Sequence, residues 1–224
     1  MLAKILTHLY RWVLLGSLVG ALAGLSSAAF LQVLGWATNF RLDHGWLLWL
    51  LPAGGLVVGV AYHHLGGRAQ GGSALIVEEI HEPTAWVPRR MAPLVFLGTI
   101  VTHLCGGSAG REGTAIQMSG SLTDGFARLL HVERDDRRLM LIAAIAGGFG
   151  SVFGVPIAGC VFALEVQTAH RVRAVVPALT ASVVGDLVVR AAGVTHTPLP
   201  HLAPFDLTAS LAARVVLAGV AFGL

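Results

Sequence analysis

A glycine-rich segment at residues 106–118 holds one arginine and one glutamate, and it is the part of the sequence best suited to chemistry. It reads Gly-Gly-Ser-Ala-Gly-Arg-Glu-Gly-Thr-Ala-Ile-Gln-Met, and residues 91–110 contain no Asp, Glu, Lys or Arg. A carboxylate at membrane depth is costly, so Glu112 is a candidate functional group. Glycines let several backbone N–H groups face one point, which favours an anion site at a helix N-terminus. An anion site beside a titratable carboxylate predicts coupled movement of an anion and a proton.

Each candidate residue also has a simpler interpretation. Ser73, after a glycine pair, offers a hydroxyl to an anion, or it caps a helix. Arg111 is expected to neutralise the local field or to bond a carbonyl, and direct anion contact is the alternative. Glu112 could be a structural carboxylate at the start of a helix. Glu165 is expected to pair with Arg171 or Arg173, with a proton path as the alternative reading.

Two other kinds of site are disfavoured by the sequence. Glu78 and His81 form a Glu-x-x-His pair, but a di-iron site needs a second copy and the sequence has none, so no metal is expected. The glycine segment lacks the lysine of a phosphate-binding loop and follows an apolar helix instead of a strand. We therefore expect no cofactor and no enzyme.

The elements that must position these residues are membrane helices. Hydrophobic residues make up 55% of the chain, charged residues 12%, and the mean hydropathy is +0.74. Spanning a bilayer takes about 20 apolar residues per helix, and charge-free runs of that length cover residues 12–40, 44–67, 91–110 and 139–164. The shorter runs 113–123 and 174–185 are expected to form broken or re-entrant helices shielded by protein. The composition therefore predicts an all-α polytopic membrane protein.

The remaining stretches give expectations about ends, turns and partners. The first apolar run, after Lys4 and Arg11, is expected to be a retained helix and not a signal peptide. The pI near 9.4 suggests contact with anionic lipid, and no nucleic acid is expected because basic and aromatic residues do not alternate. Cys105 and Cys160 are expected to be packed, reduced thiols.

Breaks in the helices are expected at several places. Connectors are predicted at residues 35–45 and 63–72, a helix end at 81–83, and a solvated or interfacial turn over the mixed charges of 133–138. A glycine- and proline-rich break is predicted within 139–164, and the prolines in residues 193–206 predict a loop.

Three segments, in order, resemble the CLC family of anion channels and anion/proton antiporters. Residues 110–114, Gly-Arg-Glu-Gly-Thr, resemble the family's Gly-Arg-Glu-Gly-Pro, whose glutamate is the external gating and proton-accepting group. Residues 71–79 stand where the family has Gly-Ser-Gly-Ile-Pro followed by acidic residues. Residues 148–165 resemble the family's long helix with its Phe-Asn-Ala-Pro-Leu-Ala-Gly core.

Where the sequence departs from the CLC pattern, it resembles the bacterial fluoride-exporting branch of that family, which is similar to fluoride/proton antiporters. Thr114 replaces the motif proline, and Val166 stands where many proton-coupled members have an internal glutamate. A threonine restores a backbone N–H and adds a hydroxyl. Fluoride is small and strongly hydrated, so its dehydration needs more or closer donors.

The resemblance implies a fold of two inverted repeats, with a first repeat at residues 1–192, a connecting loop at 193–208 and the start of a second repeat at 209–224. Because the sequence ends inside an apolar pattern, we expect an N-terminal portion of a longer protein. The implied activity is proton-coupled export of a halide, which is fluoride in the branch that the sequence resembles, across a bacterial inner membrane by a multi-pass homodimer. The alternatives are a chloride channel or chloride/proton exchanger of the same family, or an inactive fragment or membrane scaffold. The implied gate is Glu112, and the implied anion-binding residues are Gly72, Ser73, Ala74, Gly110, Arg111, Gly113 and Thr114.

Overall fold

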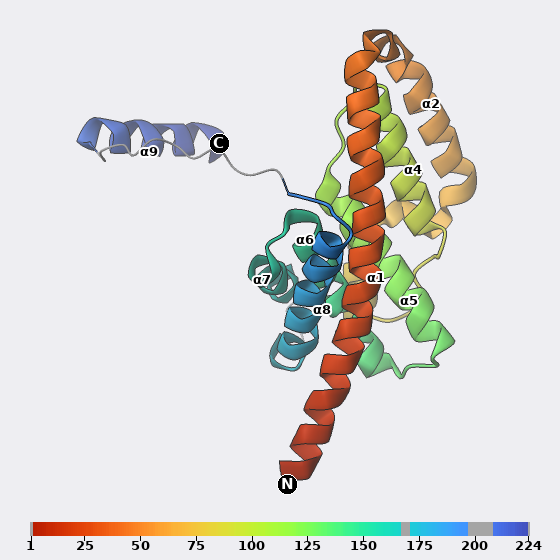
Figure 1. The fold of residues 1–224 in the computed structure, drawn as a ribbon, viewed down its shortest axis with the longest axis vertical. Coiled ribbons are helices and arrows are strands. Elements are labelled where there is room, and N and C mark those ends of the chain that lie inside the picture. The colour runs from red at the N-terminus through yellow and green to blue at the C-terminus, as the bar shows by residue number, and fades with distance from the viewer. Residues whose placement is uncertain (1, 167–170, 197–207, 224) are drawn as a thin grey trace.

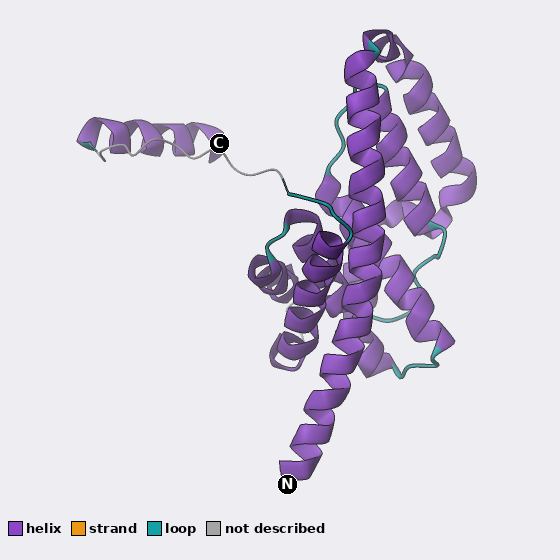
Figure 2. Ribbon diagram, viewed as in Figure 1, coloured by secondary structure: helices purple, strands orange, loops and turns teal. Residues whose placement is uncertain are grey.

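The computed structural model describes residues 2–166, 171–196 and 208–223, and every regular element within these ranges is helical (Figure 2). Helices α1 to α8 lie against one another, and α9 lies apart from them (Figure 1). Within the described residues, the helical stretches that are long and apolar enough to cross a membrane are Leu9–Asp43, Gly45–His81 and Val172–Ala191. The elements are α1 (Leu2–Asp43), η1 (Gly45–Leu50), α2 (Leu51–Ala61), η2 (Tyr62–Gly66), η3 (Gly67–Gly71), α3 (Gly72–His81), α4 (Met91–Leu104), α5 (Arg111–Leu129), α6 (Arg134–Phe153), α7 (Pro156–Val166), α8 (Arg171–Ala191) and α9 (Ala209–Gly223).

The first helix is longer than the sequence pattern predicts. α1 has 42 residues, which at 1.5 Å per residue is roughly 63 Å, about twice the thickness of a bilayer's hydrocarbon core. The predicted connector at 35–45 is therefore wrong for most of its length. Rings on successive turns stabilise this end of α1: Trp36 stacks on Phe40 at 5.5 Å, and Phe40 on His44 at 4.1 Å. α1 ends at Asp43, and His44 alone separates it from η1.

Glycines on α1 allow it to pack closely against α8. A Cβ placed on Gly16, Gly20 or Gly24 would lie 2.9, 2.5 or 2.6 Å from a backbone carbonyl oxygen of α8. The spacing of four residues puts these glycines on one face. In a lipid bilayer the hydrophobic effect does not drive helices together. Van der Waals contact between closely approaching backbones, which small residues allow, stabilises the pair instead.

The helix α8 corrects the prediction that residues 174–185 are too short to span a membrane. It has 21 residues and contains Pro177. The apolar run was cut short by Asp186, but that carboxylate is buried and accepts a hydrogen bond from Arg190, one turn later, at 2.8 Å. Because its charge is paired within the helix, Asp186 does not end α8.

The predicted break inside residues 139–164 is confirmed. α6 ends where Gly154 adopts φ +70°, a left-handed conformation that favours glycine. Pro156 then begins α7, at a position where its missing N–H costs nothing. Most of α6 is buried, among α1, α5, α7 and α8.

The mixed charges at 133–138 do not form a solvated turn. α6 begins at Arg134, and both Asp136 and Arg137 are buried. Asp136 pairs with Arg11 of α1, while Arg137 pairs with carboxylates of α3 and α5. Partners distant in the sequence therefore draw these charges into the protein.

The other boundaries fall close to their predicted places. The connector at 63–72 consists of the single turns η2 and η3, and α3 ends at His81 as predicted. Both cysteines are free and buried, as predicted. Most of the predicted loop at 193–208, including its three prolines, lies outside the described residues.

Candidate functional site

The first turns of α3 and α5 meet at one point. A Cβ placed on Gly113 would lie 3.7 Å from the Ser73 hydroxyl and 3.6 Å from the Gln117 amide nitrogen. A Cβ placed on Gly72 would lie 3.5 Å from the same amide nitrogen. We call Gly72, Ser73, Gly113 and Gln117 the α3–α5 junction.

Backbone donors are available at this junction because neither helix is capped by a side chain. The N-cap residues are Gly71 for α3 and Gly110 for α5, and neither helix has a side-chain hydrogen bond at its cap. The first N–H groups of a helix have no partner within it. Both helix dipoles also place their positive ends here, where they favour an anion.

Glycine is required at the start of α3. Gly72 has φ +58°, in the left-handed region, where a residue with a Cβ is strained. The alternative reading of Ser73 as a helix N-cap is wrong, because Gly71 holds that position. The Ser73 hydroxyl therefore faces Gly113 without a capping role.

The carboxylate of Glu112 lies at the start of α5. It is in the first turn and exposed, and a Cβ on Gly110 would lie 2.7 Å from its Oε2. The side chain thus bends back toward the helix N-terminus. This position is also the one that the structural reading of Glu112 predicts, because a carboxylate in the first turn interacts favourably with the helix dipole.

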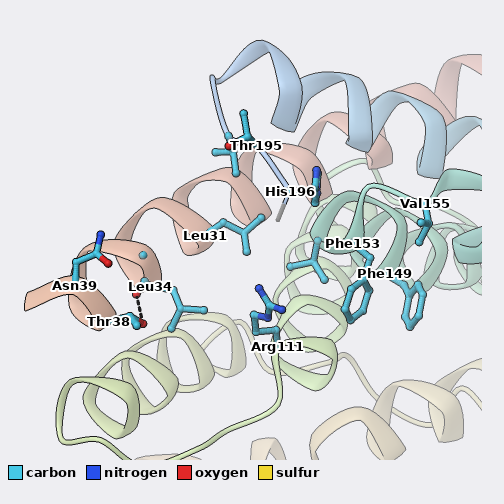
Figure 3. Close-up of a pocket in the computed structure, with 13 residues that line it drawn as sticks. Leu31, Leu34, Thr38, Asn39, Arg111, Phe149, Phe153, Val155, Thr195 and His196 are labelled. Atoms are coloured by element: carbon cyan, nitrogen blue, oxygen red, sulfur yellow. Dashed lines mark hydrogen bonds between the residues drawn. The ribbon is translucent and has the colours of Figure 1, made fainter. Parts of the chain in front are cut away.

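Arg111 and Thr114 face away from the junction. Arg111 lines a cavity of about 880 Å³ with α1, the end of α6 and residues 194–196; Figure 3 shows its guanidinium beside Leu34 and Phe153. No residue of the α3–α5 junction lines that cavity. The Thr114 hydroxyl lies 2.8 Å from that of Thr99 and donates to the Gly110 carbonyl at 3.1 Å.

The remaining predicted residues are Ala74, Gly110 and Glu165, and all three are exposed. Ala74 and Gly110 are exposed in the first turn of α3 and at the α5 cap. Glu165 is exposed on α7, and the side chain of its predicted partner Arg171 is among those that the structure leaves undescribed. Glu79, which lies between Glu78 and His81, accepts hydrogen bonds from Arg68, Arg137 and the Ala85 N–H. Within the described part of the chain, no group of three His, Cys, Asp or Glu side chains could hold a metal ion.

Two features were missed from the sequence. Gln117 was not singled out, although it lies one helical turn after Gly113 and therefore on the same face. The second is an ion-pair network of Glu79, Asp124 and Arg137, for which the spacing of residues gives no signal. Glu79 and Asp124 are fully buried, and Arg137 is 5% exposed.

Comparisons with known proteins show what this chain is similar to. The sequence pattern of the family described as "Voltage gated chloride channel" matches residues 54–224. A protein of Pseudomonas syringae pv. tomato named "Chloride/fluoride channel protein" is 46% identical over 98% of this chain and 49% of its own length. The "H(+)/Cl(-) exchange transporter ClcA" of Cronobacter sakazakii is 31% identical over 68% of this chain and 36% of its own length.

A solved structure has the same fold. The "Crystal structure of a CLC-type fluoride/proton antiporter" matches with a TM-score of 0.85 and 30% identity, over 96% of this chain and 55% of that one. The chain therefore spans about half the length of the relatives it matches.

Proposed function

This chain belongs to the voltage-gated chloride channel (CLC) family, and from that premise we propose that it moves a halide across the membrane in exchange for protons. Glu112 acts as the gate and the proton acceptor. Gly72, Ser73, Ala74, Gly110, Arg111, Gly113 and Thr114 contribute to the anion path, Ser73 through its hydroxyl and the other six chiefly through the backbone at the starts of α3 and α5. The relatives named above are channels and transporters, and none of their names describes an enzyme.

The α3–α5 junction is the observation that carries this proposal. It gathers a hydroxyl, an amide and the N–H groups at the starts of two helices, all of which are donors, as an anion requires. The Gly72 N–H is the exception, because it donates to the Ala69 carbonyl. Gln117 joins the proposed ligands because its amide is one of these donors. The Glu112 side chain bends back toward the N-terminus of α5, so its ionised carboxylate competes with the anion for the N–H groups there. Protonation removes that competition and loads one proton.

Fluoride is the proposed substrate, and chloride is the second candidate. The names of the Pseudomonas relative and of the solved antiporter both include fluoride, and threonine at position 114 retains a backbone N–H that proline lacks. The Thr114 hydroxyl is already engaged with Thr99 and Gly110, and its N–H makes the first intrahelical bond of α5, to the Gly110 carbonyl. The case for fluoride therefore rests on the names of these two relatives. Chloride is favoured instead by the relative named as a chloride exchanger.

The proposed setting is a bacterial inner membrane, in which the protein is a homodimer in contact with lipid. The exposed apolar side chains of α2, such as Leu56 at 68% and Val57 at 62%, suit a lipid environment. The proposed division of the chain remains a first repeat at 1–192, a loop at 193–208 and the start of a second repeat at 209–224.

Proton coupling can be tested with Glu112→Gln in the full-length protein, reconstituted in liposomes. Halide efflux and proton uptake are recorded together with a halide electrode and a pH-sensitive dye. The wild type is expected to take up protons as halide leaves. The variant is expected to lose proton uptake, because an amide cannot carry the proton, while halide flux stops or becomes passive.

Glu78→Gln is the matched control, since Glu78 is an exposed carboxylate on α3. It should keep coupled transport. Unchanged proton uptake in Glu112→Gln would contradict the proposed role. Liposomes loaded with each halide decide the substrate: chloride rates equal to or above those of fluoride would favour the chloride alternative.

A further inference from the structure

A buried guanidinium joins the two helices that form the α3–α5 junction. Arg137 of α6 donates to Asp124 of α5 through Nε at 2.6 Å and Nη2 at 3.0 Å. It also donates to Glu79 of α3 through Nη1 at 3.2 Å and Nη2 at 3.3 Å. One side chain thus holds a carboxylate from each helix.

The connector between α3 and α4 closes over this network. The Ala85 N–H donates to Glu79 and the Val87 N–H to Asp124, at 3.1 and 2.6 Å. The ring of Trp86 covers the guanidinium, whose Cζ lies 4.7 Å from the ring centroid. The bonds from Arg137 to Glu79 and Asp124 are buried, so water does not loosen them and their geometry is stiff. Glu79 also accepts a hydrogen bond from the partly exposed Arg68, at 2.6 Å.

The network lies along the same helices as the junction but several residues away. Glu79 is six residues after Ser73, about 9 Å along α3, and Asp124 is eleven residues after Gly113, roughly 16 Å along α5. Between the two points, Ile76 packs against Gly120, where an added Cβ would lie 2.5 Å from Ile76 Cδ1. The Ile76–Gly120 contact and the Arg137 bridge hold α3 and α5 together at two points. Because the helices are rigid, the distance between their N-terminal ends is then fixed as well.

Buried ion pairs often contribute little to stability, and their best supported use is to specify one arrangement over others. Arginine suits this use because its donors form a fixed planar fork, whereas lysine is a point charge on a flexible stem. The network is therefore suited to holding α3 and α5 at one fixed distance from each other.

We propose that Arg137 is a positioning residue that sets the distance between Ser73 and Gly113, and through it the discrimination between halides. This inference rests on the proposed anion transport at the junction. Fluoride and chloride differ in radius by less than a bond length, so a small change in helix spacing alters how many donors reach each ion.

The test uses full-length protein in liposomes, with fluoride and chloride efflux measured on the same preparations. The variants are Arg137→Lys, which keeps the charge, and Arg137→Gln. The control is Arg134→Gln, an exposed arginine at the start of the same helix. The thermal midpoint of each variant gives the folded fraction.

We expect the ratio of fluoride to chloride rates to change by roughly tenfold in both Arg137 variants, since displacements below 1 Å at a binding site have effects of that order, and to stay constant in Arg134→Gln. A purely stabilising role would lower both rates in proportion to the folded fraction and leave the ratio unchanged, which would overturn the inference. If Arg137→Gln does not fold, Arg137→Lys decides by the same criterion, and Asp124→Asn, which removes one charge but keeps the acceptor oxygen, decides if neither folds.

The proposed function fails in a different way from this inference. A wild type that moves neither halide would contradict the proposed transport, and the inference with it. A selective wild type whose ratio is unmoved by the Arg137 variants would contradict the inference alone.

Discussion

Gly113→Ala should stop transport without weakening the fold. The new methyl group would lie 3.7 Å from the Ser73 hydroxyl and 3.6 Å from the Gln117 amide nitrogen, which are ordinary contact distances. It therefore fits, and it occupies the space between the donors. Alanine also favours a helix over glycine by roughly 0.5–1 kcal/mol, so the free energy of unfolding is expected to stay the same or rise.

The loss of function follows from the donors that the methyl group blocks. A hydrogen bond to a charged group contributes about 1.5–3 kcal/mol. Blocking one of them should weaken halide affinity by a factor of roughly 10–150, at 1.4 kcal/mol per tenfold change. Blocking both side-chain donors should weaken it further.

The assay combines halide efflux from liposomes with thermal unfolding in detergent. Gly59→Ala is the control, because nothing lies within 4 Å of a Cβ at Gly59 on the exposed helix α2. Both variants should unfold at or above the wild-type temperature, and only Gly113→Ala should lose flux. Wild-type flux in a well-folded Gly113→Ala protein would refute the reasoning about the junction.

Two further predictions concern the fold. Gly20→Ala places a Cβ 2.5 Å from the Ala181 carbonyl oxygen, so overpacking of about 1–3 kcal/mol should exceed the gain in helix propensity and lower the thermal midpoint; a midpoint equal to that of Gly59→Ala would contradict the close α1–α8 packing. Cys105 and Cys160 are both buried, so a water-soluble thiol reagent should label neither rapidly in the native protein and both after unfolding, and rapid native labelling counted by mass spectrometry would contradict their burial.

The helices could be predicted where apolar pattern and glycine or proline signals agree. The break before Pro156 needed only the preceding glycines, and the end of α3 needed only Pro83 after His81. The junction between Ser73 and Gly113 followed from a resemblance between motifs, because a serine in one segment carries no signal that it will face a glycine 40 residues later.

The predictions failed where charges are paired over long distances. Arg137 looked solvated among its charged neighbours, yet its partners are Asp124 and Glu79, 13 and 58 residues earlier in the chain. Asp186 ended an apolar run in the sequence but not in the helix, since Arg190 neutralises it one turn later. A hydropathy pattern counts each charge alone, and the structure decides which charges have partners.

The most direct measurement of the central claim is halide binding to the α3–α5 junction. Isothermal titration calorimetry would compare fluoride and chloride affinity for the full-length wild type and for Ser73→Ala combined with Gln117→Leu, which removes both side-chain donors and keeps the backbone. The account predicts measurable binding to the wild type and an affinity at least about tenfold weaker in the double variant. Equal affinity for the two proteins, with both folded, would contradict it.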